Sequence, residues 1–116
     1  MHELAIAQAL VDLASAEAVR SHAVPVARVS CRVGVLRQID PTALRYAFEL
    51  ARGGTACATA ELHVEPAPLR AYCRACGREF VVEHWEWRCP ECGGDGAALS
   101  GGDELDLVSI ESEARP

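Results

Sequence analysis

Two Cys-x2-Cys pairs, separated by twelve residues, constrain the fold of this 116-residue chain more than any other feature of its sequence. The four cysteines are Cys73, Cys76, Cys89 and Cys92, and a glycine, Gly77 or Gly93, directly follows each pair. Each pair can form a turn that points two thiolates at one centre, with glycine where the backbone needs a positive φ. Four thiolates around one ion suit Zn²⁺, and this closed ligand shell leaves no position for water. The spacing therefore predicts a structural zinc site.

Other uses of these sulfurs stay open at this point. Disulfides or a redox dithiol are disfavoured, because paired turns with trailing glycines rarely serve disulfides in a reducing compartment. A rubredoxin-type iron site would use the same four sulfurs. We expect residues 80–87 to form a hairpin packed on the site, with Trp85 and Trp87 shielding the sulfurs. Without its metal this module would have almost no core, so metal binding should supply its folding free energy.

The composition argues against several classes of protein. The net charge is −6 and all eleven basic residues are Arg, so the chain is a poor partner for phosphate backbones. No apolar run approaches the length of about 18 residues that a membrane span needs. The first eight residues contain no Lys or Arg, unlike a signal peptide. We expect a cytoplasmic protein that binds neither nucleic acid nor membrane, with cysteines used for metal or thiol chemistry.

Outside the cysteine module, hydrophobic periodicity predicts two helices and three strands. Residues 3–21 carry an apolar helical stripe, and a second helix starts at Asp40-Pro41, with Asp40 as its N-cap, and stops at Gly53-Gly54. Alternating apolar residues predict strands at 26–36, 59–65 and 103–113. The glycine-rich stretch 94–102 is expected to be a linker.

This order of elements predicts an α+β fold, in which a small three-stranded sheet is covered by two helices and carries an inserted four-cysteine zinc-ribbon module. Pro66 and Pro68 mark a boundary before the module. We expect residues 1–66 and 103–116 to form one α/β domain. Residues 67–102 would form the zinc-binding module with its flanking linkers.

His2 and Glu3 stand at the start of the first helix, where neither side chain can contribute to an apolar face. An N-terminal amine, the amide nitrogen of residue 2 and the imidazole can bind one ion in adjacent chelate rings. Such nitrogen donors favour square-planar Ni(II) or Cu(II), and Glu3 or another carboxylate could complete the set. An exposed site with few ligands suits an ion that is handed on. The simpler alternative is a solvated histidine before a helix.

The chain resembles the HypA/HybF family of nickel metallochaperones for [NiFe]-hydrogenase maturation. The resemblance covers nearly the whole chain and rests on MHE at the start, DPTALRYAFELARGGT, AELHVE, the four cysteines with CPECG, and GDELDLVSIE. It implies transient Ni(II) binding at His2 with Glu3 beside it, leaves open a contribution from the Met1 amine, and implies a resident zinc ion on the four cysteines. The resemblance also implies delivery to the hydrogenase large subunit with a HypB-type GTPase. Some relatives also supply urease maturation proteins.

Asp40 has two competing interpretations. Some members of that family are thought to bind nickel through an acid at this position, whereas the Asp-Pro pair favours a helix cap, which we prefer. His22, His63 and His84 match no motif of the family.

Enzyme activity is not expected, because the chain shows no nucleophile–base pairing, phosphate-binding loop or open zinc site. The alternative function is a zinc-ribbon adaptor that binds nucleic acid or a transcription complex. The acidic balance of the chain counts against it. Residues 70–93 carry four Arg and four Glu, and four thiolates exceed the charge of zinc by two, so the folded module would be net negative and lack a basic footprint.

Overall fold

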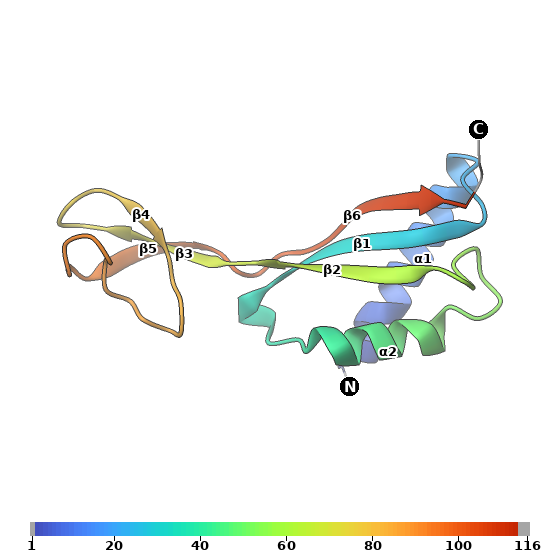
Figure 1. The fold of residues 1–116 in the computed structure, drawn as a ribbon, viewed down its shortest axis with the longest axis horizontal. Helices are drawn as coiled ribbons and strands as arrows, with labels where there is room; N and C mark the ends of the chain where they lie inside the picture. The colour runs from blue at the N-terminus through green and yellow to red at the C-terminus, as the bar shows by residue number, and fades with distance from the viewer. Residues whose placement is uncertain (1, 114–116) are drawn as a thin grey trace. The chain divides into compact units, whose positions relative to one another are not determined.

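The computed structural model describes residues 2–113, which contain two α-helices, a short 3-10 helix and six strands (Figure 1). In chain order these are α1 (His2–Arg20), β1 (Val26–Gly34), η1 (Val35–Arg37), α2 (Pro41–Ala51), β2 (Glu61–Ala67), β3 (Leu69–Cys73), β4 (Glu79–Val81), β5 (Gly96–Gly101) and β6 (Leu105–Ser112). One sheet has the strand order β2-β1-β6, and the other has the order β4-β3-β5. Within the described residues, no helix is long and apolar enough to cross a membrane.

The chain divides into two compact units. The first contains the described residues up to Arg32, Ile39–Glu65 and the described residues from Leu105, and the second contains Val33–Gln38 and Pro66–Glu104. Residues 33–38 belong to the second unit because the Gly34 N–H donates to the Glu104 carbonyl (2.8 Å) and the Leu36 N–H donates to the Gly102 carbonyl (2.7 Å). The predicted fold class is confirmed, since a three-stranded sheet with two helices accompanies a separate four-cysteine module.

The core of the first unit is built from the apolar faces that the sequence predicts. Helix α1 buries Ala7, Leu10, Val11, Ala14 and Ala18, while α2 buries Leu44, Ala47 and Phe48. The small alanines let α1 pack closely against α2, and α1 also contacts β6. On the central strand β1, Val29 and Cys31 are fully buried. Burial of these side chains is the main favourable contribution to the stability of this unit.

The strands of the first unit also carry a set of cross-strand ion pairs. Arg32 on β1 pairs with Glu65 on β2 (3.0 Å), and Arg28 on β1 pairs with Glu111 on β6 (3.9 Å). These side chains are about half exposed and alternate with the buried residues of β1. Such pairs contribute little each, but they help to fix which strands lie side by side.

Helix α1 ends at Arg20, one residue before the predicted end at Ser21. His22 has a left-handed φ of 57°, the His22 N–H donates to the Val19 carbonyl, and the Ala23 N–H donates to the Ala18 carbonyl. These two bonds form a Schellman motif, which satisfies carbonyls of the last turn.

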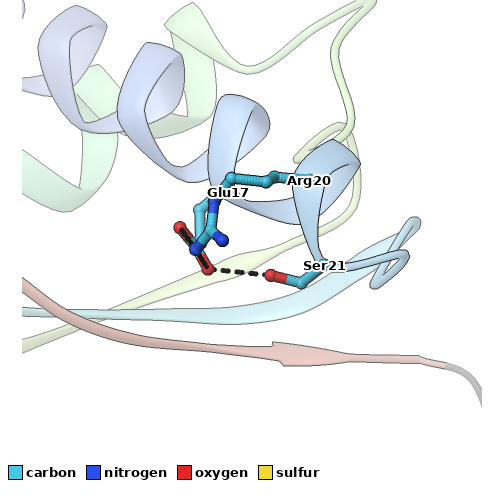
Figure 2. A network of polar contacts seen from close by, with 3 residues as sticks. All are labelled: Glu17, Arg20 and Ser21. Carbon is cyan, nitrogen blue, oxygen red and sulfur yellow. Dashed lines mark hydrogen bonds and ion pairs between the residues drawn. The ribbon is translucent and has the colours of Figure 1, made fainter.

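A polar network accompanies this helix end (Figure 2). The Glu17 carboxylate accepts from Arg20 Nη2 (2.6 Å) and from the Ser21 hydroxyl (2.8 Å). The hydrogen bonds from Arg20 and then Ser21 lower the pKa of Glu17. This network ties the last turn of α1 to the residue that follows it.

In the second unit, β3 pairs antiparallel with both β4 and β5. Two sequence predictions are therefore wrong. Residues 80–87 do not form a hairpin, because β4 pairs with the strand that precedes the first cysteine pair. The stretch 94–102 is not merely a linker, because residues 96–101 form β5. The hydrophobic core cluster of the unit consists of Leu69, Ala71, Cys73, Phe80, Val82 and Cys89.

Gly34 is required by a close approach of two backbone segments within the second unit. A Cβ at this position would overlap the Gly102 carbonyl group and lie 2.6 Å from the Asp103 nitrogen. We expect Gly34→Ala to lower the free energy of unfolding of this unit by about 3 kcal/mol. Urea unfolding followed by tryptophan fluorescence would measure this, since both tryptophans lie in this unit. Gly53→Ala is the control, because nothing lies within 4 Å of its added Cβ. Equal stability of the two variants would contradict the prediction.

Asp40 caps α2 as the sequence predicts. Its Oδ1 accepts from the backbone N–H of Thr42 (2.9 Å), and Pro41 occupies the first helical position. We expect Asp40→Ala to destabilise the first unit by about 1 kcal/mol, whereas Asp40→Asn, which preserves the cap, should change stability by only a few tenths. Thermal unfolding monitored by the helical circular dichroism signal would test this. A loss of stability in Asp40→Asn as large as in Asp40→Ala would show that the cap is not what Asp40 contributes.

Candidate metal centre

The four predicted cysteines come together at one point of the second unit. Their sulfur atoms all lie within 4.8 Å of one another, with 3.5 Å between Cys73 and Cys92 and 3.7 Å between Cys76 and Cys89. Four bonds of about 2.3 Å to a tetrahedral zinc ion would place the sulfurs about 3.8 Å apart. The donor set therefore fits a tetrahedral metal with four sulfur ligands. Among the described residues, no other group of three or more His, Cys, Asp or Glu side chains could hold a metal ion.

The two Cys-x2-Cys turns repeat the same hydrogen bonds. In the first turn the Cys73 N–H donates to the Arg78 carbonyl (2.8 Å), and the Gly77 N–H donates to the Cys73 carbonyl (2.9 Å). In the second turn the corresponding bonds join Cys89 with Gly94 (2.8 Å) and Gly93 with Cys89 (2.9 Å).

Both trailing glycines of these turns have a positive φ, 75° at Gly77 and 76° at Gly93. This conformation is the one for which the sequence predicts glycine at both positions. The two copies of the sequence motif thus form two turns of the same structure.

Gly94 is a site residue that the sequence interpretation missed. A Cβ there would lie 3.2 Å from the Cys73 sulfur, 3.3 Å from the Cys92 sulfur and 3.0 Å from the Ala75 Cβ. The Gly94 N–H also points toward the Cys92 sulfur, at 3.4 Å. Its only sequence signal was the second glycine of the Gly-Gly pair after Cys92.

The four sulfurs divide into two environments. Cys73 and Cys89 are buried and belong to the core of the unit, whereas Cys76 and Cys92 are exposed. Trp85 does not belong to this core, and its side chain is 52% exposed. Cys73 and Cys89 thus occupy positions in a small core that apolar side chains would otherwise fill. A bound ion would connect this core to the exposed second cysteine of each pair, Cys76 and Cys92.

The close sulfurs oppose one another's ionisation. The backbone N–H of Cys76, helped by the Cys92 thiol and the Ala75 N–H, outweighs desolvation and lowers the pKa of Cys73 to about 7. At Cys92 the largest influence, the Gly94 N–H, lowers the pKa, but the neighbouring sulfurs and desolvation together raise it to about 12. One thiolate forms readily and the next does not, so a divalent cation is what would let all four sulfurs ionise together.

The remaining two cysteines stay apart from this cluster. Cys31 is fully buried on β1, where burial raises the pKa of its thiol to about 11, and it is a small apolar core residue as its strand position predicts. Cys57 is also fully buried, with its sulfur 3.6 Å from the Ser15 hydroxyl. Neither is placed to bind the metal of the cluster.

His2 and Glu3 lie at the first turn of α1 in the first unit. The His2 Nε2 is 3.4 Å from the Glu3 Oε2, and the two side chains are 59% and 22% exposed. A nitrogen and an oxygen at this distance can both reach one ion with bonds of about 2 Å. Met1, whose amine was a further predicted donor, lies outside the described residues.

The other predicted or considered positions do not form a second cluster. Asp40 caps α2 through one carboxylate oxygen, as described above. His22 lies at the end of α1, His63 is exposed on β2, and His84 lies in a turn beyond β4.

Comparison with known proteins shows the family to which this chain belongs. Residues 1–112 match the model of a family described as hydrogenase/urease nickel incorporation, metallochaperone, hypA. The hydrogenase maturation factor HypA of Chloroflexus aggregans is 37% identical over 113 residues, which are 97% of this chain and 99% of the relative. The factor of the same name from Desulfosudis oleivorans is 38% identical over 112 residues, covering 96% and 97%.

Two solved structures share the fold. A solution structure of HypA protein has a TM-score of 0.70 and 25% identity, over 99% of this chain and 98% of that one. The solution structure of the nickel metallochaperone HypA from Helicobacter pylori gives 0.65 and 23%, over 97% and 98%, which shows likeness of fold. Because the family model spans both the start of α1 and the four-cysteine cluster, this chain belongs to the HypA family of nickel-incorporation metallochaperones, which are maturation factors and not enzymes.

Proposed function

We propose that this chain binds Ni(II) transiently at His2 and Glu3 and delivers it for the maturation of [NiFe]-hydrogenase, while a structural zinc ion stays on the four cysteines. One observation carries the proposal: the chain holds two chemically different donor sets in two different units. The first is a nitrogen–oxygen pair at the start of α1 whose imidazole is exposed, and the second is a half-buried set of four sulfurs. We accordingly propose a nickel-binding domain of residues 1–66 and 103–116, and a zinc-binding module of residues 67–102.

The His2–Glu3 pair suits an ion that must leave again. Imidazole nitrogen is a good ligand for Ni(II), and the carboxylate adds charge without adding softness. Because the His2 side chain is 59% exposed, an incoming ligand from a partner can reach the ion before the old ligand departs. Glu3 lies in the first turn of α1, where the helix dipole favours a negative charge. Further donors would come from backbone nitrogens near His2 and from the Met1 amine.

The four-sulfur set suits an ion that stays. Zinc with four thiolates has no open coordination position, so this ion would neither bind water nor be transferred easily. Two of the proposed ligands belong to a core cluster whose other members are Leu69, Ala71, Phe80 and Val82. Loss of the ion would therefore remove much of what holds the unit together.

The proposed partners follow from the family. The relatives are hydrogenase maturation factors, and the family description names hydrogenase and urease. We propose that the chain works with a HypB-type GTPase, supplies the hydrogenase large subunit and, in some settings, urease maturation proteins. A cytoplasmic location stays a prediction from the cysteine usage.

Nucleic-acid binding, the alternative function, receives no support. The second unit carries five Arg against seven Asp or Glu, so it lacks a basic surface.

Removal of the zinc should unfold the second unit and leave the first intact. Zinc binding is worth about 10–16 kcal/mol in zinc-finger peptides, far more than a core of this size can replace. We expect elemental analysis to find one zinc per chain, and Cys92→Ala or a strong chelator to abolish the native tryptophan fluorescence while the helical signal of the first unit persists. Cys57→Ala, buried but outside the cluster, is the control that should keep its zinc. Iron in the purified protein, or native fluorescence without metal, would contradict the assignment.

Nickel binding should depend on His2 and not on the cysteines. We expect isothermal titration of the zinc-loaded chain to show one nickel site that His2→Ala weakens by at least about 100-fold, and that Glu3→Gln weakens less. His63→Ala, which removes another exposed imidazole of the first unit, should leave the affinity unchanged. Asp40→Asn should also leave it unchanged, because the role of this carboxylate is to cap α2. Full nickel affinity in His2→Ala, or nickel displacing zinc from the sulfurs, would refute the proposal.

A further inference from the structure

The turn that follows β4 places two large side chains in a backbone conformation that they rarely adopt. His84 and Trp85 have φ values of 54° and 59°, and the Glu86 N–H donates to the Glu83 carbonyl (2.9 Å), which closes the turn. Two successive positive φ values are typical of a type I′ turn, where Asn-Gly is strongly preferred. A tryptophan at such a position is strained, and strain of this kind is commonly retained where a side chain has a function.

The strained turn forms one wall of an apolar hollow. The hollow has a volume of about 290 Å³ and is lined by Val35, Leu69, Val82, His84 and Trp85, all in the second unit. Trp85 is 52% exposed and Val35 is 39% exposed, so the rim offers apolar surface to an incoming group. The hollow contains none of the four clustered cysteines, so shielding of the sulfurs does not explain the position of Trp85.

The opposite wall of the hollow is firmly held. The segment that carries Val35 is fixed by the Gly34–Glu104 and Leu36–Gly102 backbone bonds, and the Arg37 Nε donates to the Asp103 carbonyl (2.9 Å). The Val82 N–H donates to the Leu69 carbonyl (2.8 Å), so two further lining residues are joined to each other and to β3, the central strand of this sheet. A hollow with fixed walls binds at a smaller cost in conformational entropy than one that must form first.

The charges beside the hollow are negative. Glu83 and Glu86 stand at the two ends of the turn, both are exposed, and neither forms an ion pair within the described part of the chain. Arg37 bonds to a carbonyl (2.9 Å) and Arg70 pairs with Glu79 (3.9 Å), while Arg88 approaches Glu86 only through its backbone N–H, which donates to the Glu86 Oε1 (3.2 Å). A partner whose charge complements this rim is therefore basic.

We propose that this hollow is a docking site for a partner protein, and that it takes a large apolar side chain flanked by Arg or Lys. The apolar side chain lies against Val35, Leu69 and Val82, and a flanking cation stacks on the Trp85 ring and faces Glu83 or Glu86. The strained turn keeps the indole of Trp85 at the rim of the hollow, where it is exposed, and prevents it from packing into the core. The site is independent of the nickel site proposed above, because no residue of the first unit lines it.

The test uses the full chain and a short peptide with one Phe between two Arg residues. We expect the peptide to shift the amide NMR signals of residues 35, 69, 82, 84 and 85, with a dissociation constant of about 0.1–1 mM. A peptide with Glu in place of Arg, and one with Ser in place of Phe, should bind at least about tenfold more weakly. Peptide binding should be unchanged in His2→Ala, so failure of the docking proposal can be distinguished from failure of the nickel proposal.

Matched variants identify the side chains responsible. Trp85→Ala should weaken the Arg-Phe-Arg peptide at least about tenfold, whereas Trp87→Ala, which removes a similarly exposed indole outside the hollow, should not. Glu83→Gln with Glu86→Gln should weaken binding and reduce its salt dependence, while Glu79→Gln with Glu91→Gln, whose carboxylates already pair with arginines, should do neither. Zinc content confirms that each variant is folded. Equal loss in both tryptophan variants, equal binding of the Glu-Phe-Glu peptide, or signal shifts outside the hollow would overturn the proposal.

Discussion

The second unit depends on the approach of four cysteine sulfurs to within 4.8 Å of one another. Thiolates at this separation repel: the neighbouring sulfurs and desolvation raise the pKa of Cys92 to about 12, whereas the hydrogen bond from the Cys76 N–H lowers the pKa of Cys73 to about 7. Backbone N–H groups of the two turns stabilise part of the negative charge, and a divalent cation would stabilise the rest. Since Cys73 and Cys89 also belong to the hydrophobic core, binding of a metal ion and folding of the unit depend on each other.

The first unit, in contrast, owes its fold to the packing of its helices. Its helices bury small residues such as Ala7 and Ala14 to let α1 and α2 approach closely, so it folds through packing without a metal in its core. The proposed donor pair, His2 and Glu3, lies in the first turn of α1 and outside that packed core. An ion bound there, as proposed, would enter and leave the first unit without disturbing the packing that keeps it folded, which is the property that a carrier of nickel needs.

What the sequence predicts correctly is what local patterns determine. The stripe of α1, the Asp40 cap of α2, the alternation in β1 and the positive φ at Gly77 and Gly93 each depend on residues within a few positions of one another. The errors concern pairing between distant segments. Strand β5 has no alternating apolar pattern and is recognisable only by its pairing with β3, while β4 pairs with β3 across the first cysteine pair. The His2–Glu3 donor pair stays a prediction, and the Met1 amine, whose contribution the sequence leaves open, lies outside the described residues.

The turn at Glu83–Glu86 shows why such a position escapes sequence analysis. Turn prediction relies on residues such as Asn and Gly that adopt a positive φ at no cost, and His84-Trp85 contains neither. The same turn with Asn-Gly would be less strained. The exposed tryptophan there, beside an apolar hollow and between two carboxylates, supports the proposed docking site, and a metal ion on the four cysteines would then support recognition as well as folding.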